Sequence, residues 1–273
     1  MQSVPRGRTA YAVGMRTADA PAARPTATGR HLCWAYADRD EFLGQARDFL
    51  AEGRASGAAV RLVGDGLPDV EGVPAEPVSD VYGVVDPAAT VSYWAAALAD
   101  ALAAGHTGLR VVGEVTPLVR SAAQIAAFAA YEHQVDRLMA RHPLSGMCAY
   151  DRRRVDPAAL SDLASLHAVH NLPGVSFRLH AVAGSGDLAI SGELDVTGMA
   201  ALARLLDRVA PTVVDGELVV DARGLDFVDH RSLMQLASYA RGRGATAVLR
   251  TPLPAAARLV ELLRVPGLRV EAR

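Results

Sequence analysis

The chain has 273 residues, a length that suits one large domain or two of ordinary size. Hydrophobic residues make up 51% and aromatic residues 5%, so we expect a sizeable core built mainly from Leu, Val and Ala. The formal net charge of −2 gives no electrostatic reason to expect a nucleic-acid partner, and no apolar run approaches the roughly 20 residues of a membrane helix.

The lysine and cysteine content excludes some classes of function. The sequence contains no lysine, which excludes a Schiff-base lysine and the phosphate-binding lysine of a Walker A loop. Its two cysteines, Cys33 and Cys148, do not suggest a disulfide framework and suit a reducing compartment, so we predict a cytoplasmic protein. Residues 1–29 lack the apolar segment of a signal peptide and are interpreted as a disordered tail.

Strands and helices are predicted to alternate over residues 30–170. We expect strands at 31–36, 59–63, 81–85, 109–112 and 146–150, helices at about 40–56, 87–104, 121–141 and 157–167, and a loop over 67–80. Asp86-Pro87 and Asp156-Pro157 indicate helix starts, because the carboxylate caps the first turn and proline suits its first position. This order implies an α/β fold in which helices cover a parallel sheet.

The pattern changes after residue 170, and we predict a second domain over residues 171–273. Strands at 176–183 and 187–191, separated by Gly184-Ser185-Gly186, form a hairpin signal. A helix from about Met199 to Val209 and a strand at 217–221 follow, and then a turn through Gly224. Asp229 is predicted to cap a helix over 230–242, before a strand at 246–250, a helix at 254–263 and a last strand near 268–270. A hairpin followed by alternating elements predicts a mixed sheet.

A small-molecule site is predicted in the first domain. Polarizable and apolar side chains with a few polar tips are typical of such pockets, and the candidates are His31, Cys33, Trp34, Tyr36, Glu114, Cys148 and Tyr150. A structural histidine is the alternative for His31, and buried small residues are the alternative for the cysteines. Glu114 ends a strand, where α/β sheets present functional groups, and a ligand contact or an inward hydrogen bond is favoured over a catalytic base.

The same part of the chain contains residue types that bind metals. His31, Cys33, His142 and Cys148 are candidate ligands, but their spacing matches no zinc finger or zinc ribbon. We therefore expect no metal and no cofactor. In the second domain Asp195, Asp221 and Asp229 end predicted elements, and we expect them to cap turns and helices.

Residues 187–265 resemble a STAS domain, the fold of bacterial anti-sigma-factor antagonists, in stretches 188–195, 218–221, 227–229 and the helix with Leu233. The resemblance implies a partner surface at Asp195, Asp229, His230, Arg231 and Ser232, and a partner that is an anti-sigma factor or serine-kinase-like regulator. The family's switch reads Asp-Ser-Ser/Thr-Gly, and its second hydroxyl residue is phosphorylated. Arg231 fills that position here, so we do not expect phosphorylation there, and Ser232 is a displaced alternative.

Residues 31–167 resemble the MEDS (DcmR-like) sensory domain, a degenerate RecA-like fold. The stretches that carry the resemblance are 31–33, the helix from Glu41, 113–116 and 148–152. The family has lost nucleotide hydrolysis, and the resemblance implies that small organic molecules are sensed through a site that includes the histidine. Fusion of such a sensor to a STAS domain is typical of actinobacteria.

These observations predict a non-enzymatic regulator of transcription. Its first domain would sense an unknown small organic ligand, and its second would bind the anti-sigma-type partner, without nucleic-acid or membrane partners. One alternative is a RecA-like domain that binds or hydrolyses nucleotides with Glu114 as base, which the absence of lysine disfavours. A second alternative is a scaffold whose first domain has no ligand.

Overall fold

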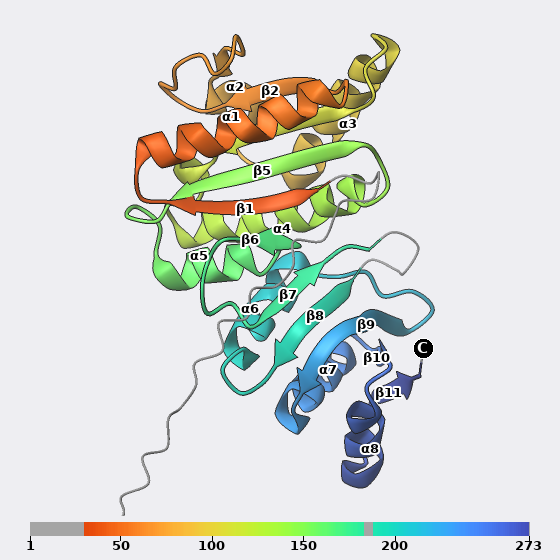
Figure 1. The fold of residues 1–273 in the computed structure, drawn as a ribbon. Helices are drawn as coiled ribbons and strands as arrows, with labels where there is room; N and C mark the ends of the chain where they lie inside the picture. The colour runs from red at the N-terminus through yellow and green to blue at the C-terminus, as the bar shows by residue number, and fades with distance from the viewer. Residues whose placement is uncertain (1–29, 183–187, 273) are drawn as a thin grey trace, which may run out of the picture.

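The computed structural model describes residues 30–182 and 188–272 (Figure 1). These residues form two sheets with their own helices, and the chain passes from the first sheet to the second between residues 170 and 177. We refer to residues 30–170 as the N-terminal domain and to the following residues as the C-terminal domain. The predicted tail, residues 1–29, and the predicted hairpin turn at 184–186 lie outside the described residues.

The N-terminal domain contains a sheet of six parallel strands in the order β3-β2-β4-β5-β1-β6. The strands are β1 (His31–Tyr36), β2 (Ala59–Val63), β3 (Ala75–Glu76), β4 (Leu109–Glu114), β5 (Leu144–Asp151) and β6 (Val169–His170). The helices are α1 (Arg39–Ala55), α2 (Val78–Tyr82), α3 (Pro87–Ala103), α4 (Ala122–Met139) and α5 (Pro157–Ala164), with a 3₁₀ turn at Thr116–Leu118. The parallel α/β sheet predicted for this domain is confirmed.

Capping side chains set the starts of the main helices in this domain. Asp38 accepts hydrogen bonds from two backbone N–H groups of α1, and Ser121 accepts one from α4. Asp86 and Asp156 each cap a helix whose first residue is proline. Each cap satisfies a donor that has no partner inside its helix. The helix starts predicted at Asp86-Pro87 and Asp156-Pro157 are confirmed.

The two faces of the first sheet carry different helices. Cys33 and Ala35 of β1 belong to the apolar cluster that includes side chains of α3 and α4. Tyr36 belongs instead to the cluster with Phe42 and Leu50 of α1. Successive side chains of a strand point to opposite faces, so β1 contributes to both layers of the core.

The C-terminal domain contains a mixed sheet of five strands in the order β11-β10-β9-β8-β7. Strands β7 (Phe177–His180) and β8 (Ala189–Leu194) are antiparallel, and the other pairs are parallel. The remaining elements are α6 (Met199–Val209), β9 (Glu217–Val228), α7 (His230–Gly242), β10 (Thr246–Arg250), α8 (Pro254–Leu263) and β11 (Leu268–Glu271). The predicted mixed sheet is confirmed.

Three local predictions were wrong. The loop predicted at 67–80 contains β3 and the first residues of α2. The strand predicted at 81–85 does not form, and its first two residues end α2, in which Val78, Val81 and Tyr82 are buried at helical spacing. The turn predicted through Gly224 does not form, because β9 continues and register shifts along β8 accommodate the irregular pairing.

The two domains share one continuous core. A single cluster of buried apolar residues runs from the α3 and α4 face of the first sheet into the C-terminal domain. Helix α4 packs against α6, and the backbone N–H of Leu179 in β7 donates to the carbonyl of Ser165 at 2.6 Å. Among the described residues, no helix combines the length and apolar character needed to cross a bilayer.

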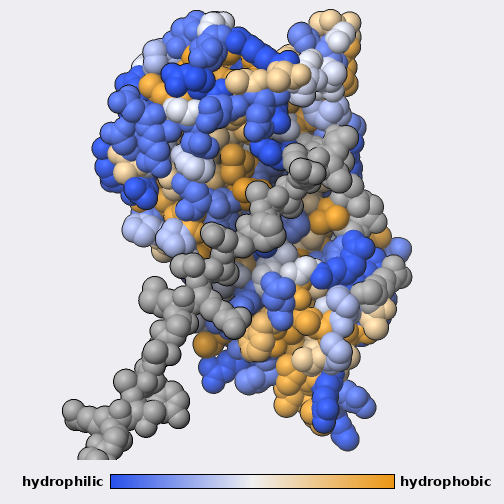
Figure 2. All heavy atoms as spheres, viewed as in Figure 1, coloured by the Kyte–Doolittle hydropathy of each residue, from blue (hydrophilic) through white to orange (hydrophobic). Residues whose placement is uncertain are grey.

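Large apolar side chains are exposed near one end of the second sheet. Val196, Phe227 and Met234 have exposed fractions of 52%, 49% and 53%. Each is close in sequence to the carboxyl end of β8 or β9, two parallel neighbours in register at Glu193 and Phe227. Figure 2 shows hydrophobic residues gathered low on this domain, where Figure 1 draws β9 and α7.

Candidate functional site

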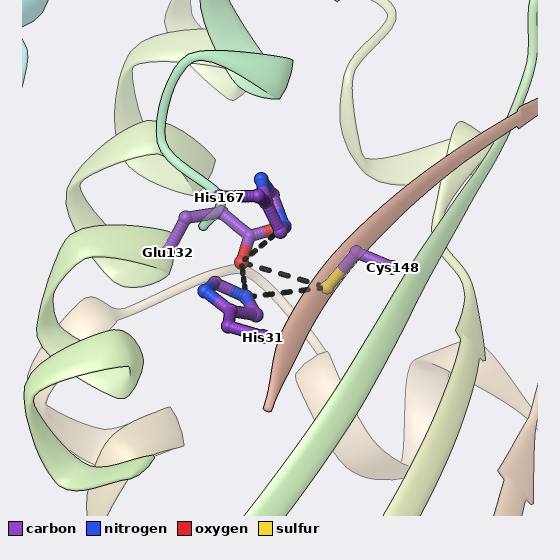
Figure 3. Close-up of side chains that lie close together, drawn as sticks. All are labelled: His31, Glu132, Cys148 and His167. Carbon is purple, nitrogen blue, oxygen red and sulfur yellow. Dashed lines mark hydrogen bonds and ion pairs between the residues drawn. The ribbon is translucent and has the colours of Figure 1, made fainter. Parts of the chain in front are cut away.

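A fully buried polar cluster lies between the first sheet and α4. Glu132 and Asp136 are four residues apart on α4 and therefore lie on the same face of the helix. Glu132 meets His31 from β1, Cys148 from β5 and His167, which follows α5 (Figure 3). Asp136 meets His31 from its other side. Charged and polar side chains are rarely buried unless they are paired, so this cluster requires a physical account.

Glu132 is the centre of the cluster. Its Oε2 lies 2.9 Å from Nε2 of His31, 3.5 Å from Sγ of Cys148 and 3.6 Å from Nε2 of His167. The other carboxylate oxygen accepts a hydrogen bond of 2.8 Å from the Tyr150 hydroxyl. One carboxylate with no solvent exposure thus faces groups from three different elements.

His31 lies between two carboxylates. Its Nδ1 is 3.0 Å from Oδ1 of Asp136, and its Nε2 faces Glu132. Burial disfavours the charged imidazolium, but the hydrogen bonds and charges of Asp136 and Glu132 outweigh this cost and raise the pKa of His31 to about 9. His31 is therefore a cation at neutral pH, held by two anions.

His167 has the opposite electrostatic character. Burial and the nearby charge of His31 lower the pKa of His167 to about 4, so it is neutral at pH 7. Its Nδ1 lies 2.8 Å from the carbonyl oxygen of Leu163, which can only accept, so Nδ1 carries the proton. The Nε2 of His167 then has a lone pair directed at the Glu132 carboxylate, and it has no hydrogen-bond partner.

Burial keeps the two thiols and the Tyr150 hydroxyl neutral, whereas Glu132 stays charged. Burial raises the pKa of the Cys148 thiol, as does the charge of Glu132, and the same two causes raise the pKa of Cys33 and of Tyr150. Burial also works against the Glu132 carboxylate. The charge of His167, which is protonated at the acid pH concerned, and the bond from His31 nevertheless lower the pKa of Glu132 to about 2.

Three cavities adjoin α4 in the described part of the chain. One of about 10 Å³ lies against Cys148, is lined by the aromatic side chains of Tyr82, Trp94 and Tyr131 among others, and has room for about one water molecule. A second, of about 360 Å³, lies at the first turns of α4. The third, a groove of about 390 Å³, lies between the domains. It is lined by residues of α4 and its C-terminal end, among them Arg137, and by 209–212 of the C-terminal domain.

The predicted ligand residues do not line one pocket. His31, Cys33, Cys148 and Tyr150 lie on the α4 face of the sheet, where the structure brings three of them to Glu132. Trp34, Tyr36 and Glu114 lie on the α1 face, where the Tyr36 hydroxyl donates to Glu114 at 3.0 Å. The seven residues were grouped by chemistry, and strand alternation separates them. His142, weighed as a metal ligand, is exposed after α4.

Glu132, Asp136 and His167 were not predicted from the sequence. A signal for Glu132 was present, because it lies four residues after the apolar Phe128, a spacing that places both residues on one face of a helix. A carboxylate at an inward position is either paired or functional. His167 gave no such signal, since it follows a short helix and reaches Glu132 only through the tertiary fold.

The predicted partner residues share one end of the C-terminal domain. Asp195 accepts hydrogen bonds from Thr197 and Gly198, and Asp229 caps α7, so the expected capping roles of these two carboxylates are confirmed. His230 and Arg231 are exposed. Ser232 is only 1% exposed, so its hydroxyl is not on the surface where it was predicted. The third carboxylate, Asp221, was predicted to end a strand, but it lies inside β9, where it pairs with Arg223.

Comparisons with known proteins identify one of the two domains. Residues 30–168 match the family model described as MEDS, the MEthanogen/methylotroph, DcmR Sensory domain. No curated protein and no solved structure matches the chain. The family match ends before the second sheet begins, so the STAS resemblance of the C-terminal domain stays a prediction.

Proposed function

Because this chain belongs to the MEDS family over residues 30–168, we propose that it is a sensory signalling regulator in which helix α4 carries the signal. The N-terminal domain receives an input beside α4. The C-terminal domain acts as a STAS-type module that binds an anti-sigma factor or a related serine-kinase-like regulator. The protein itself is proposed to catalyse no reaction.

One contact carries this proposal. Asp136 is bonded to His31 through Oδ1 at 3.0 Å, and its Oδ2 accepts the backbone N–H of Ala181 at 2.5 Å. Ala181 directly follows β7 of the second sheet. A single buried carboxylate therefore joins the polar cluster to the C-terminal domain, so a change in the cluster bears directly on the end of β7.

Two further contacts support coupling between the domains. Asp162 of α5 accepts a bidentate pair of hydrogen bonds from Arg204 of α6, both at 2.8 Å, and a third at 2.8 Å from Arg208. The carbonyl of Ser165, two residues before His167, accepts from Leu179 of β7. Helix α4 and the segment that includes α5 and His167 supply the cluster from outside the sheet. Both therefore also bond to the C-terminal domain.

The ligand must bind more tightly to one of two arrangements of these contacts. A ligand that binds both arrangements equally does not shift the equilibrium between them. The groove of about 390 Å³ beside α4 has the volume of a small-molecule site, whereas the cavity at Cys148 does not. A small organic molecule therefore fits the groove, and the buried cluster suits a much smaller occupant. The groove and the buried cluster both contact helix α4.

The output surface is proposed at the start of α7. His230 and Arg231 are exposed there beside the apolar side chains of Phe227 and Met234. Aromatic residues, methionine and arginine are enriched in protein interfaces. Arg231 presents a permanent positive charge, so this surface suits an acidic partner surface and requires no phosphorylation to become charged.

The rival proposal is a nucleotide-dependent enzyme. In α/β folds the helix start after the first strand is a common phosphate site, because its N–H groups and dipole favour anions. Here Asp38 already occupies two of those N–H groups, and Asp40 and Glu41 add negative charge in the first turn. A thermal-shift screen with ATP, GTP and Mg²⁺, followed by a phosphate-release assay, tests this rival. A stabilising shift with turnover would favour it.

Partner binding tests the output half of the proposal. A purified serine-kinase-type anti-sigma factor from the same host is titrated with the full chain and with Arg231→Glu. Reversal of the charge at position 231 is expected to weaken binding at least tenfold, because it places an anion against an acidic surface. Arg258→Glu, an exposed arginine on α8, is the matched control and should bind like the unaltered chain. Equal affinity of all three proteins contradicts the proposed surface.

Native mass spectrometry separates a sensor from a ligand-free scaffold. The full chain is purified from its own host and its mass is compared with the mass calculated from the sequence. A sensor of a small molecule is expected to retain mass that denaturation removes. Absence of any bound species under several growth conditions favours the scaffold.

A further inference from the structure

Four potential metal ligands converge in the buried cluster. Nε2 of His31, an Oε atom of Glu132, Sγ of Cys148 and Nε2 of His167 all lie within 4.8 Å of one another. They come from β1, α4, β5 and the segment after α5, and Figure 3 shows the four side chains directed toward one point. We propose that these four residues form a site for one divalent transition-metal ion, for which Zn²⁺ is the best match.

The donor types fit zinc. Zinc in proteins is bound by imidazole nitrogen, thiolate sulfur and carboxylate oxygen, most often by four ligands in a tetrahedron. Calcium and magnesium require oxygen ligands, and this site offers oxygen from one residue of four. The mixed set of nitrogen, sulfur and oxygen donors therefore favours zinc over calcium and magnesium.

The separations between the donors are close to those of a tetrahedral site. Bonds of about 2.0–2.3 Å place tetrahedral ligands about 3.3–3.8 Å apart. The separations from Oε2 of Glu132 are 2.9 Å to His31, 3.6 Å to His167 and 3.5 Å to Cys148. Sγ of Cys148 is 3.8 Å from Nε2 of His31. These four separations are within a few tenths of an ångström of tetrahedral values. The other two, from His167 to His31 and from His167 to Cys148, are at most 4.8 Å, so His167 must move by up to about 1 Å for coordination.

The unpartnered nitrogen of His167 is the independent observation for a cation. Nε2 is buried, carries a lone pair and faces the lone pairs of a carboxylate at 3.6 Å, an arrangement in which neither group donates. A buried polar atom without a partner destabilises the folded state. A metal ion between Nε2 and Glu132 would convert this cost into two coordinate bonds.

The surrounding groups orient the ligands as metal sites require. Metal-bound histidines usually donate their other N–H to a carboxylate or a backbone carbonyl, which fixes the tautomer. Nδ1 of His31 is bonded to Asp136, and Nδ1 of His167 is bonded to the Leu163 carbonyl. Tyr150 holds the second oxygen of Glu132 at 2.8 Å. Three of the four ligands therefore have an outer partner.

The cavity of about 10 Å³ against Cys148 is lined by none of the other three ligands, so the proposed ion lies between the four side chains and not in that cavity. That this ion acts as a sensory input rests on the proposed function, because the signal leaves the site through Asp136. Binding of the ion does not depend on that function.

Metal binding is tested on the tag-free full chain after dialysis against a chelator. Zn²⁺ and Co²⁺ are titrated separately, with stoichiometry read by native mass spectrometry and cobalt coordination read by absorption. One ion per chain is expected, with tetrahedral cobalt bands and a thiolate-to-cobalt charge-transfer band. Protons should be released as the ion binds, because Cys148 coordinates as a thiolate, and the affinity should rise with pH.

Variants locate the site. Cys148→Ser should abolish the charge-transfer band, and His167→Gln should weaken Co²⁺ binding at least tenfold. Cys33→Ser is the matched control. Cys33 is also buried and lies next to Cys148 in the register of β1 and β5, but it is not one of the four ligands. This variant should keep the band and the affinity. Circular dichroism checks the fold of each variant.

X-ray absorption of the zinc-loaded unaltered chain needs no variant. One sulfur and three nitrogen or oxygen ligands are expected, and any other sulfur count overturns the site. Failure of the folded chain to bind either ion at one equivalent, or loss of the band in Cys33→Ser, also overturns it. If binding fails while Asp136→Leu still alters hydrogen exchange in β7, the metal assignment is wrong and the proposed coupling stands.

Discussion

Neutralising the centre of the buried cluster should strongly destabilise the N-terminal domain. In Glu132→Gln the side chain keeps its size but loses the charge that faces His31 at 2.9 Å and the Tyr150 hydroxyl at 2.8 Å. Removing one partner of a buried ion pair costs about 3–5 kcal/mol, because the other charge stays buried without compensation. For a domain of this size that loss lowers the melting temperature by roughly 6–20 °C.

The matched control has the same change at an exposed ion pair. Glu52 bonds to Arg30 and Arg110, and its side chain is 57% exposed, so Glu52→Gln should cost no more than about 1 kcal/mol. Both variants are compared with the unaltered chain by urea denaturation and thermal unfolding in metal-free buffer at pH 7. Equal stability of the two variants would refute the view that Glu132 is the electrostatic centre of the cluster.

Three other changes test separate parts of the structure. In metal-free protein the stabilising effect of His31 is complete below pH 6.5 and is lost as pH rises through about 9. Stability is also lost as pH falls from 6.5 through about 4, where folded His167 resists protonation. Urea denaturation should therefore give a maximum near pH 6.5, and a flat profile would contradict the two shifts. Asp162→Asn removes the charge that holds Arg204 and should speed hydrogen exchange in α6, whereas unchanged exchange would show that this pair does not join the domains. Gly192→Ala should cost about 1–3 kcal/mol by denaturation, because Gly192 has φ +88° and an added Cβ would lie 2.5 Å from a backbone oxygen. Unchanged stability would contradict that backbone conformation.

The fold was largely predictable because its signals are local. Asp86-Pro87 and Asp229 fix helix starts through bonds to residues three positions away, and the predicted range 230–242 is the observed α7. Short elements were less predictable. The buried spacing of Val78, Val81 and Tyr82 fits one helical turn, but a turn of that length gives too little periodicity to separate it from a strand.

The site was less predictable because tertiary structure assembles it. His31 and Cys148 were identified from their chemistry, and parallel pairing of β1 with β5 brings their strands together. Trp34 and Tyr36 were grouped with them, although alternation along β1 directs both to the other face. Glu132 and His167 are 35 positions apart, and no local pattern links a helix face to the end of a later helix.

The link between the buried cluster and the C-terminal domain is tested most directly by hydrogen exchange in Asp136→Leu. This change removes the acceptor of both the His31 ring and the Ala181 N–H. Exchange at Ala181 and in β7 should become faster than in the unaltered chain, while exchange in α8 stays the same. Asp100→Leu, at an exposed position of α3, should change neither region. Identical exchange at Ala181 and in β7 for Asp136→Leu and the unaltered chain would contradict the proposed route of the signal.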